Sequence, residues 1–174
     1  ALAVAAYNAI VEVVDGILYI RTDEEADISR DEPTIESIED AITYFDSVSD
    51  AAEQIDEPIL CFQNDAAELD GICMVSNPID GMYLESRYLL HDGIKVAIEQ
   101  SWGGKHEENV VANPMQETFS VLLDNGIAID GVYSSSDSVF VGVAVAPYTV
   151  IRICVENIHE TDTIQELLND LTMN

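Results

Sequence analysis

The hydrophobic pattern of the chain is strongest between Val139 and Leu171. Two nearly continuous apolar runs, VFVGVAVA (139–146) and YTVIRICVEN (148–157), have the length of β-strands and meet at Ala146-Pro147. Strands this hydrophobic are typical of the middle of a sheet, where both faces are covered. We therefore expect these two segments to form the centre of a β-sheet.

A short amphipathic helix is predicted after the second of these strands. Its apolar residues recur at the spacing of one helix face, a pattern that lets the helix lay a single stripe on a sheet. Asp162 is predicted to cap this helix, with Gln165 three residues later as in a capping box. The residues of the stripe are Ile164, Leu167, Leu168 and Leu171.

An N-terminal helix is predicted over residues 1–16. The segment ALAVAAYNAIVEVV (1–14) has only two polar residues, Asn8 and Glu12, so a helix here would be apolar on nearly every side. At about 1.5 Å per residue it would span about 21 Å, less than the roughly 30 Å core of a bilayer. We expect this helix to pack on the domain and to continue from a membrane span before Ala1.

An acidic connector is predicted over residues 23–41, because this segment is rich in Asp and Glu and has no sustained apolar period. It is followed by a strand-like segment, ITYFDS (42–47), and then by a predicted helix over residues 47–57. Ser47 is the expected N-cap of that helix. One apolar stripe runs along it, formed by Val48, Ala51, Ala52 and Ile55.

The remainder of the chain reads as successive strands joined by turns. In IKVAIEQSW (94–102) the polar residues alternate with Ile94, Val96 and Ile98, the pattern of a half-buried antiparallel strand. The segment 103–114 is predicted to be a polar loop. Because strands follow one another without crossover helices, we predict one α+β domain over residues 1–174. Its antiparallel sheet would carry the N-terminal, middle and C-terminal helices mainly on one face.

The charge of the chain limits its partners. The sequence has 34 acidic and 6 basic residues, with a net charge of -28. Such a surface repels phosphate groups and anionic lipid heads, so we expect no nucleic-acid partner and no membrane contact beyond a span upstream. Three interpretations of the charge remain: a solvated acidic surface, a protein adapted to high salt, and a mimic of DNA.

No motif in the sequence indicates catalysis, a metal site or a cofactor. The histidines His91, His106 and His159 lack metal-binding spacing, and no G-x-S-x-G surrounds a serine. The three cysteines stand in apolar runs without a CxxC pair, as expected of buried thiols. We therefore assign no catalytic, metal-binding or cofactor-binding residue and expect a protein that is not an enzyme.

Three residues are the candidates for a partner or ligand surface. Tyr88 and Trp102 are large aromatic residues near the ends of predicted strands, and His106 stands in the predicted polar loop. Aromatic side chains of this kind can line a pocket, although packing in a core is their commoner role.

The order of elements resembles that of extracytoplasmic domains of unknown function, the DUF4367-like group of Gram-positive bacteria. The resemblance is carried by ALAVAAYNAIVEVVDGILYI (1–20), ITYFDSVSDAAEQIDEPIL (42–60), IKVAIEQSW (94–102) and VAVAPYTVIRICVENIHETDTIQELLNDL (143–171). Such domains often follow a single membrane span and are sometimes fused to anti-sigma-factor modules. The resemblance transfers no functional residue.

The resemblance implies a non-enzymatic, extracytoplasmic regulatory or sensory domain of a membrane-tethered bacterial protein that is anti-sigma-factor-like. Its partner would be another envelope protein or a cationic molecule. The alternative is a secreted acidic binding or inhibitor domain that meets a basic partner. Both interpretations place the protein outside the cytoplasm, anchored to the cell membrane or secreted.

Overall fold

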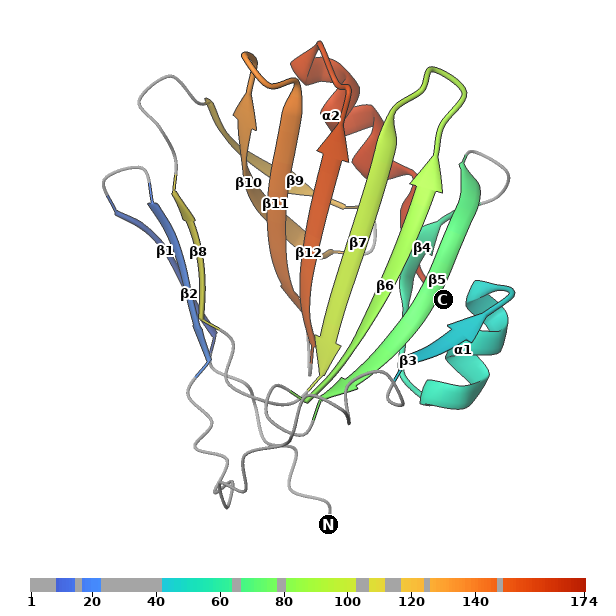
Figure 1. Cartoon of the computed structure of the whole chain (residues 1–174). Helices are drawn as coiled ribbons and strands as arrows, with labels where there is room; N and C mark the ends of the chain where they lie inside the picture. Colours follow the sequence, from blue (N-terminus) through green and yellow to red (C-terminus); the bar gives the residue numbers. More distant parts are fainter. Residues whose placement is uncertain are drawn as a thin grey trace.

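The computed structural model of the chain consists mainly of β-strands (Figure 1). The residues that it describes are 9–14, 17–22, 42–63, 67–77, 81–102, 107–111, 117–123, 126–146 and 149–174. The predicted connector over residues 23–41 lies outside this set.

An eight-stranded antiparallel sheet forms the body of the molecule. The two strands predicted at its centre, β11 and β12, are adjacent in it and are flanked on both sides. In spatial order the strands are β3 (Ile42–Phe45), β5 (Glu68–Asn77), β6 (Gly81–Leu89), β7 (Lys95–Trp102), β12 (Thr149–Glu156), β11 (Val139–Ala146), β10 (Ala128–Ser134) and β9 (Glu117–Leu122).

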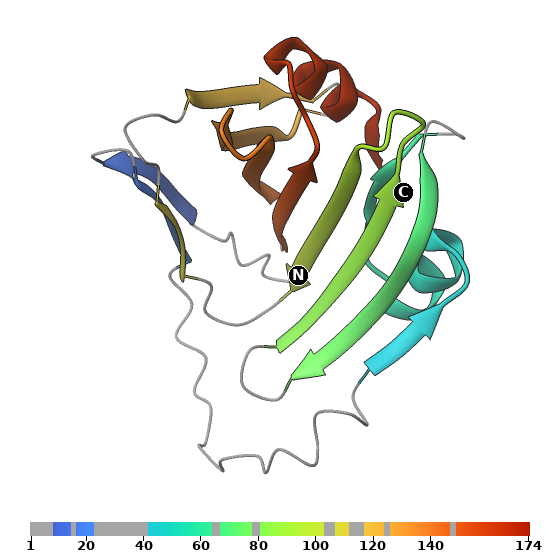
Figure 2. The same ribbon diagram turned by 45° about the horizontal axis from the view of Figure 1, so that its top comes forward.

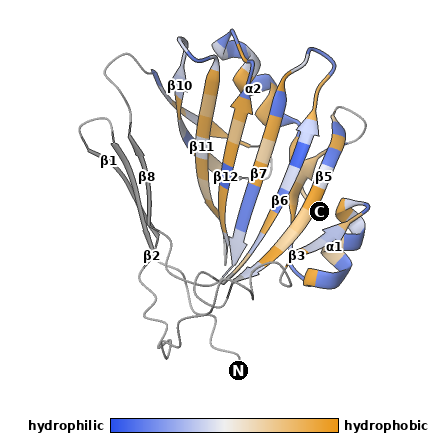
Figure 3. Ribbon diagram, in the orientation of Figure 1, coloured by the Kyte–Doolittle hydropathy of each residue, from blue (hydrophilic) through white to orange (hydrophobic). Residues whose placement is uncertain are grey.

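One face of this sheet, called here the inner face, carries the core. The helices α1 (Val48–Ile55) and α2 (Thr161–Asn169) both lie on this side (Figures 1 and 2). Alternation along the strands turns large apolar side chains inward into this core. The hydropathy colouring shows that the central strands are mostly hydrophobic (Figure 3). The core of α2 and the central strands includes Ile98, Ile151, Ile153, Ile164 and Leu168.

The predicted fold class is wrong in its helices. The structure has two helices in its described part, and most of the remaining described residues belong to antiparallel strands, so the fold is mainly β and not α+β with three helices. Where an N-terminal helix was predicted over residues 1–16, Ala9–Val14 forms strand β1. The apolar run has the composition of either element, and its β-branched second half, AIVEVV, favours a strand.

Strand β1 belongs to a second, three-stranded sheet with β2 (Ile17–Thr22) and β8 (Glu107–Val111). Strand β8 lies within the segment 103–114 that was predicted to be a polar loop. Pairing with β2 gives the short, polar segment a partner that its own sequence pattern does not reveal.

The two helices differ in how they begin. Ser47 caps α1 as predicted, since its Oγ accepts a hydrogen bond from the Asp50 N–H at 3.1 Å. Helix α2 begins after Glu160, which makes no side-chain cap, so the predicted capping role of Asp162 is wrong. Asp162 instead stands in the first turn, where a carboxylate is favourable to the helix dipole.

A two-stranded sheet of β4 (Leu60–Phe62) and β13 (Leu171–Met173) completes the inner layer. Gln100 joins it to the main sheet from the inner face of β7. Its Oε1 accepts a hydrogen bond from Leu60 N–H at 2.9 Å, and its Nε2 donates one to the Pro58 carbonyl at 2.6 Å. Gln100 is buried, so both of its polar groups find protein partners where water is excluded.

Candidate functional site

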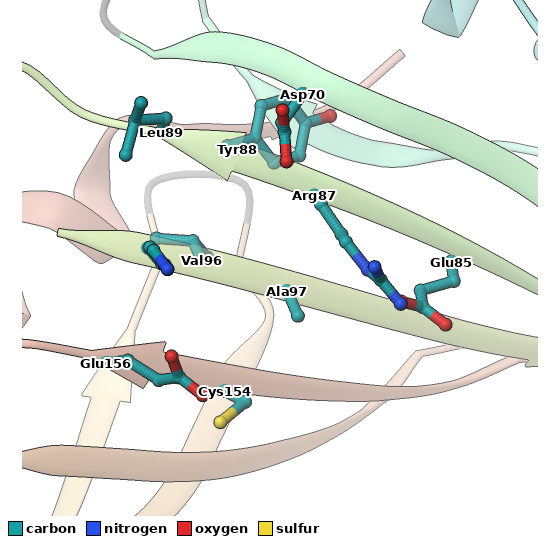
Figure 4. Close-up of a pocket in the computed structure, with 10 residues that line it drawn as sticks. Asp70, Glu85, Arg87, Tyr88, Leu89, Val96, Ala97, Cys154 and Glu156 are labelled. Atoms are coloured by element: carbon teal, nitrogen blue, oxygen red, sulfur yellow. The ribbon is translucent and has the colours of Figure 1, made fainter. Parts of the chain in front are cut away.

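A groove lies on the outer face of the main sheet, across β5, β6, β7 and β12 (Figure 4). Its volume is about 590 Å³, within the range of small-molecule sites. Its charged lining residues are Asp70, Glu85, Arg87, Lys95 and Glu156. We call this feature the outer groove.

Strand alternation places these side chains together. Glu85 and Arg87 are two residues apart on β6 and therefore share the outer face. Lys95 begins β7 and is paired with Glu156 of β12, so the outer groove extends across that pair of strands. A sequence pattern of period two on three adjacent strands thus produces a charged surface over an apolar core.

A β-bulge brings the fifth charged residue to the groove. The pairing of β5 with β6 shifts between Leu69 and Gly71, which leaves Asp70 as the extra residue. Bulges redirect a side chain that regular pairing would hold elsewhere. Asp70 consequently lines the same groove as Arg87. The pKa of that guanidinium is raised first by the hydrogen bond and the charge of Glu85, and also by the charge of Asp70.

The electrostatic centre of the groove is the ion pair of Arg87 and Glu85. The Arg87 Nε–H donates to the Glu85 carboxylate, and this hydrogen bond is the main cause that raises the pKa of Arg87 above its ordinary value. The Arg87 side chain is nevertheless 66% exposed. Because the Nε–H is bound to Glu85, the N–H groups of the two terminal guanidinium nitrogens can donate hydrogen bonds to an acceptor on a ligand.

The thiols near the groove carry a raised pKa. Burial raises the pKa of the Cys154 thiol, and the neighbouring Glu156 carboxylate raises it further. The pKa of Cys73 is raised by burial and, to a smaller extent, by the charge of Glu85. Both thiols therefore remain protonated at neutral pH, whereas reactive cysteines have a lowered pKa. The outer groove offers charge and shape for binding but no activated sulfur.

The structure separates the residues predicted to form a partner surface. Tyr88 borders the outer groove, but its side chain is 5% exposed and packs edge-on against Phe62 on the inner face. Trp102 is 8% exposed and belongs to the core beneath α1, with Ile72 and Leu84. The two aromatic residues lie about 20 Å apart along the strands, because Tyr88 is paired with Val96 and Trp102 lies six residue steps further along β7. His106 lies outside the described residues.

One serine and one histidine lie close together away from the groove. The Ser138 Oγ and the His159 Nδ1 are 3.0 Å apart on the exposed surface after β10 and β12. A nucleophilic serine also needs a pocket and an oxyanion site. The outer groove is lined by neither residue, so we assign this pair no catalytic role.

The charged residues of the outer groove were missed from the sequence. The sequence does contain the alternation that places them on one face. Glu85 and Arg87 are two positions apart in one predicted strand, and Lys95, Ala97 and Glu99 alternate with apolar residues in the next. Alternation identifies a solvated face but not which strands are neighbours in the sheet. The bulge at Asp70 gives no pattern of its own.

Within the residues that the structure describes, no group of three or more His, Cys, Asp and Glu side chains is arranged to hold a metal ion. The described helices include none with the length and hydrophobicity needed to cross a bilayer. Comparison with known proteins adds no relative, because no family model, no curated protein and no solved structure matches the chain.

Proposed function

We propose that the chain is a non-enzymatic regulatory or sensory domain of the bacterial envelope, and that it binds a partner or ligand in the outer groove. The domain would be tethered to the membrane by a segment preceding Ala1, in the manner of anti-sigma-factor proteins. The outer groove is the observation that carries this proposal, since it gathers two of the six basic residues of the chain with three carboxylates.

The signs of the charges define what the groove can accept. Arg87 and Lys95 attract carboxylate or phosphate groups, while Asp70, Glu85 and Glu156 disfavour a ligand that is only anionic. A ligand with both signs, such as a peptide segment or another zwitterion, would satisfy both sets. Leu89 and Ala97 add apolar surface for its uncharged part.

The arrangement of the groove also suits a binding role. Its residues lie on strands of the main sheet and not on long loops, so the site is held rigidly by the core beneath it. The one thiol that the groove lining includes, that of Cys154, has a raised pKa and is not activated. These features support recognition more than chemistry.

The proposal can be tested in the native bacterium by comparing three strains. One carries a deletion of the gene, one carries Arg87→Gln with Lys95→Gln, and one carries the charge-conserving exchange Arg87→Lys with Lys95→Arg. We expect the deletion to change a defined set of transcripts and the first variant to reproduce that change, because it removes the positive charges of the groove. The charge-conserving variant should retain most of the wild-type pattern.

An additional control separates the groove from a general effect of charge. Arg152→Gln removes a basic residue that belongs to β12 but does not itself line the groove, and it should leave transcription unchanged. Thermal melts of the purified variants establish that each is folded. A deletion without any transcriptional effect, or a chain that intact cells shield from added protease, would contradict an envelope regulator.

A further inference from the structure

Strand β3 ends the main sheet with an open edge. It pairs with β5 alone, from Ile42 opposite Val75 to Phe45 opposite Ile72. In an antiparallel ladder every second residue directs its N–H and C=O to one neighbour, so about two of its four residues face away from β5. Among the described residues, none forms a strand on that side.

This edge lacks the features that usually prevent pairing with another chain. Natural edge strands often carry lysine, proline, a bulge or an inward-facing charge, whereas β3 reads ITYF. Tyr44 is 77% exposed and Ile42 is 36% exposed, and both face outward on the same side. The strand therefore offers open backbone groups beside exposed apolar side chains.

The negative charge around β3 favours a basic binding partner at this edge. Residues 46–57, which follow the strand and include α1, contain five acids and no base. Exposed acids of this segment include Asp46, Asp50 and Glu53, and α1 lies beside β3 (Figure 1). A second copy would bring the same acids together, at a net charge of -28 per chain, so self-pairing is disfavoured.

We propose that the open edge of β3 binds an extended, basic segment of another protein, which adds to the sheet as a further strand. Because side chains alternate along a strand, the segment would direct basic residues toward the acids of α1 and apolar residues toward Tyr44 and Ile42. This site is separate from the outer groove and does not depend on the function proposed for it.

Backbone pairing and charge would contribute differently to this complex. The few hydrogen bonds of a four-residue edge fix the direction and register of the segment, but each adds only about 0.5–1.5 kcal/mol net. Electrostatic attraction accelerates the encounter and weakens as salt rises. The complex should therefore be moderate in affinity and sensitive to ionic strength.

The test uses a synthetic peptide of about eight alternating lysine and valine residues, a length that exceeds β3 on both sides. Two-dimensional NMR of the labelled protein should show the largest shifts at the amides of 42–45. Replacing Ile42 and Tyr44 by lysine should weaken binding by about tenfold, equivalent to about 1.4 kcal/mol, because it adds repulsive charge and removes apolar contact.

Two controls separate strand addition from general attraction to an acidic protein. Ser120→Lys with Leu122→Lys adds the same charge at exposed positions of β9, the other end of the sheet, and should change the affinity by less than about twofold. A peptide with alternate backbone nitrogens methylated keeps its charges but loses donors, and should bind about tenfold more weakly.

Three outcomes would overturn the proposal. The first is that the peptide does not bind at low salt. The second is that the methylated peptide binds as tightly as the unmethylated one, or that the NMR shifts spread over the acidic surface; either result means electrostatic attraction without strand pairing. The third is dimerisation of the protein alone in sedimentation measurements, abolished by the lysines at positions 42 and 44. That result would make a second copy the occupant.

Discussion

Two glycines make room for the aromatic centre of the core. Gly131 of β10 pairs with Gly142 of β11, and the ring of Phe140 lies against both. A Cβ added at Gly131 would lie 2.5 Å from two ring carbons of Phe140 and 2.7 Å from the backbone oxygen of Val141. The backbone oxygen cannot move as a side-chain end can, so the position requires glycine.

Gly131→Ala is therefore expected to destabilise the protein by about 1–3 kcal/mol, the usual cost of overpacking a core. Gly71→Ala is the matched control, because a Cβ at Gly71 meets no atom within 4 Å and the residue also lies in a strand. Urea unfolding of both variants measures the difference. Equal midpoints would mean that Phe140 repacks without cost.

Two buried tyrosines differ in their hydroxyl groups. Tyr133 donates a hydrogen bond to the Ile158 carbonyl at 3.1 Å, whereas the Tyr88 hydroxyl is buried without a hydrogen-bond partner. Burial raises the pKa of Tyr88 to about 12, and Ser86 offsets the shift in part. An unpartnered buried hydroxyl carries a desolvation cost that a phenylalanine would avoid.

Tyr88→Phe should accordingly leave stability unchanged or raise it at pH 7, while Tyr133→Phe should cost about 1 kcal/mol. Above pH 10 the unfolded chain loses the Tyr88 proton before the folded protein does, so the wild type loses stability as pH rises from about 10 toward about 12. Tyr88→Phe should remove that part of the alkaline slope. Unfolding free energies at pH 7, 9 and about 11 provide the measurement. An identical slope in both proteins would contradict the assignment.

At the scale of elements, one polar side chain links strand β4 to the main sheet. Gln100 satisfies a backbone donor and a backbone acceptor of the β4 segment at once, from the centre of β7. Pro58, whose carbonyl it binds, precedes the strand, and Leu60 lies in it. The inner layer is thus attached to the sheet by polar as well as apolar contacts.

Gln100→Leu should cost about 1–3 kcal/mol, because it leaves the buried Leu60 N–H without a partner and also removes the partly buried bond to the Pro58 carbonyl. Gln54→Leu, on an exposed position of α1, should change stability by less than about 0.5 kcal/mol. Hydrogen exchange offers an independent measurement, since the amide of Leu60 should lose protection in the first variant. Retained protection at Leu60 would show that the bond to Gln100 is dispensable.

How far the sequence predicts the fold depends on the kind of element. The stripe of α1, the first three residues of the α2 stripe and the alternation of β7 were predicted correctly, because packing agrees with local pattern there. Leu171, the fourth residue of the predicted α2 stripe, instead begins β13. β1 was misassigned because a mostly apolar run suits a helix or a strand, and β8 because its partner β2 is distant in sequence. The outer groove depends on strand order and on a bulge, neither of which periodicity encodes.

At the scale of the molecule, the acidic surface encloses an extensive apolar core. The net charge of -28 implies strong repulsion among carboxylates, whereas the core contains many large side chains that are fully buried. Burial of that size should hold the fold together without high salt. We therefore expect the melting temperature to depend on salt because salt screens the repulsion between carboxylates, and not because the fold is adapted to molar salt.

The melting temperature should rise over the first few hundred millimolar of salt and then reach a plateau, because the Debye length falls from about 30 Å at 0.01 M to about 8 Å at 0.15 M. Sodium and potassium chloride should give the same curve if the effect is screening. A thermal melt series from dilute buffer to molar salt measures it. Unfolding in dilute buffer, or stability that climbs throughout, would instead indicate a salt-adapted protein.

The pairing of β13 with β4 has a consequence for the order of events during biosynthesis. Leu171 is opposite Phe62, and the Asn174 N–H donates to the Ile59 carbonyl at 2.8 Å, so the inner layer closes only when residue 174 is available. At about 5–20 residues per second, several seconds separate the synthesis of these two segments. Throughout that interval Leu60 and Phe62 lack their partner strand, so we expect this part of a nascent chain to stay accessible to chaperones and proteases until residues 171–174 have been synthesised.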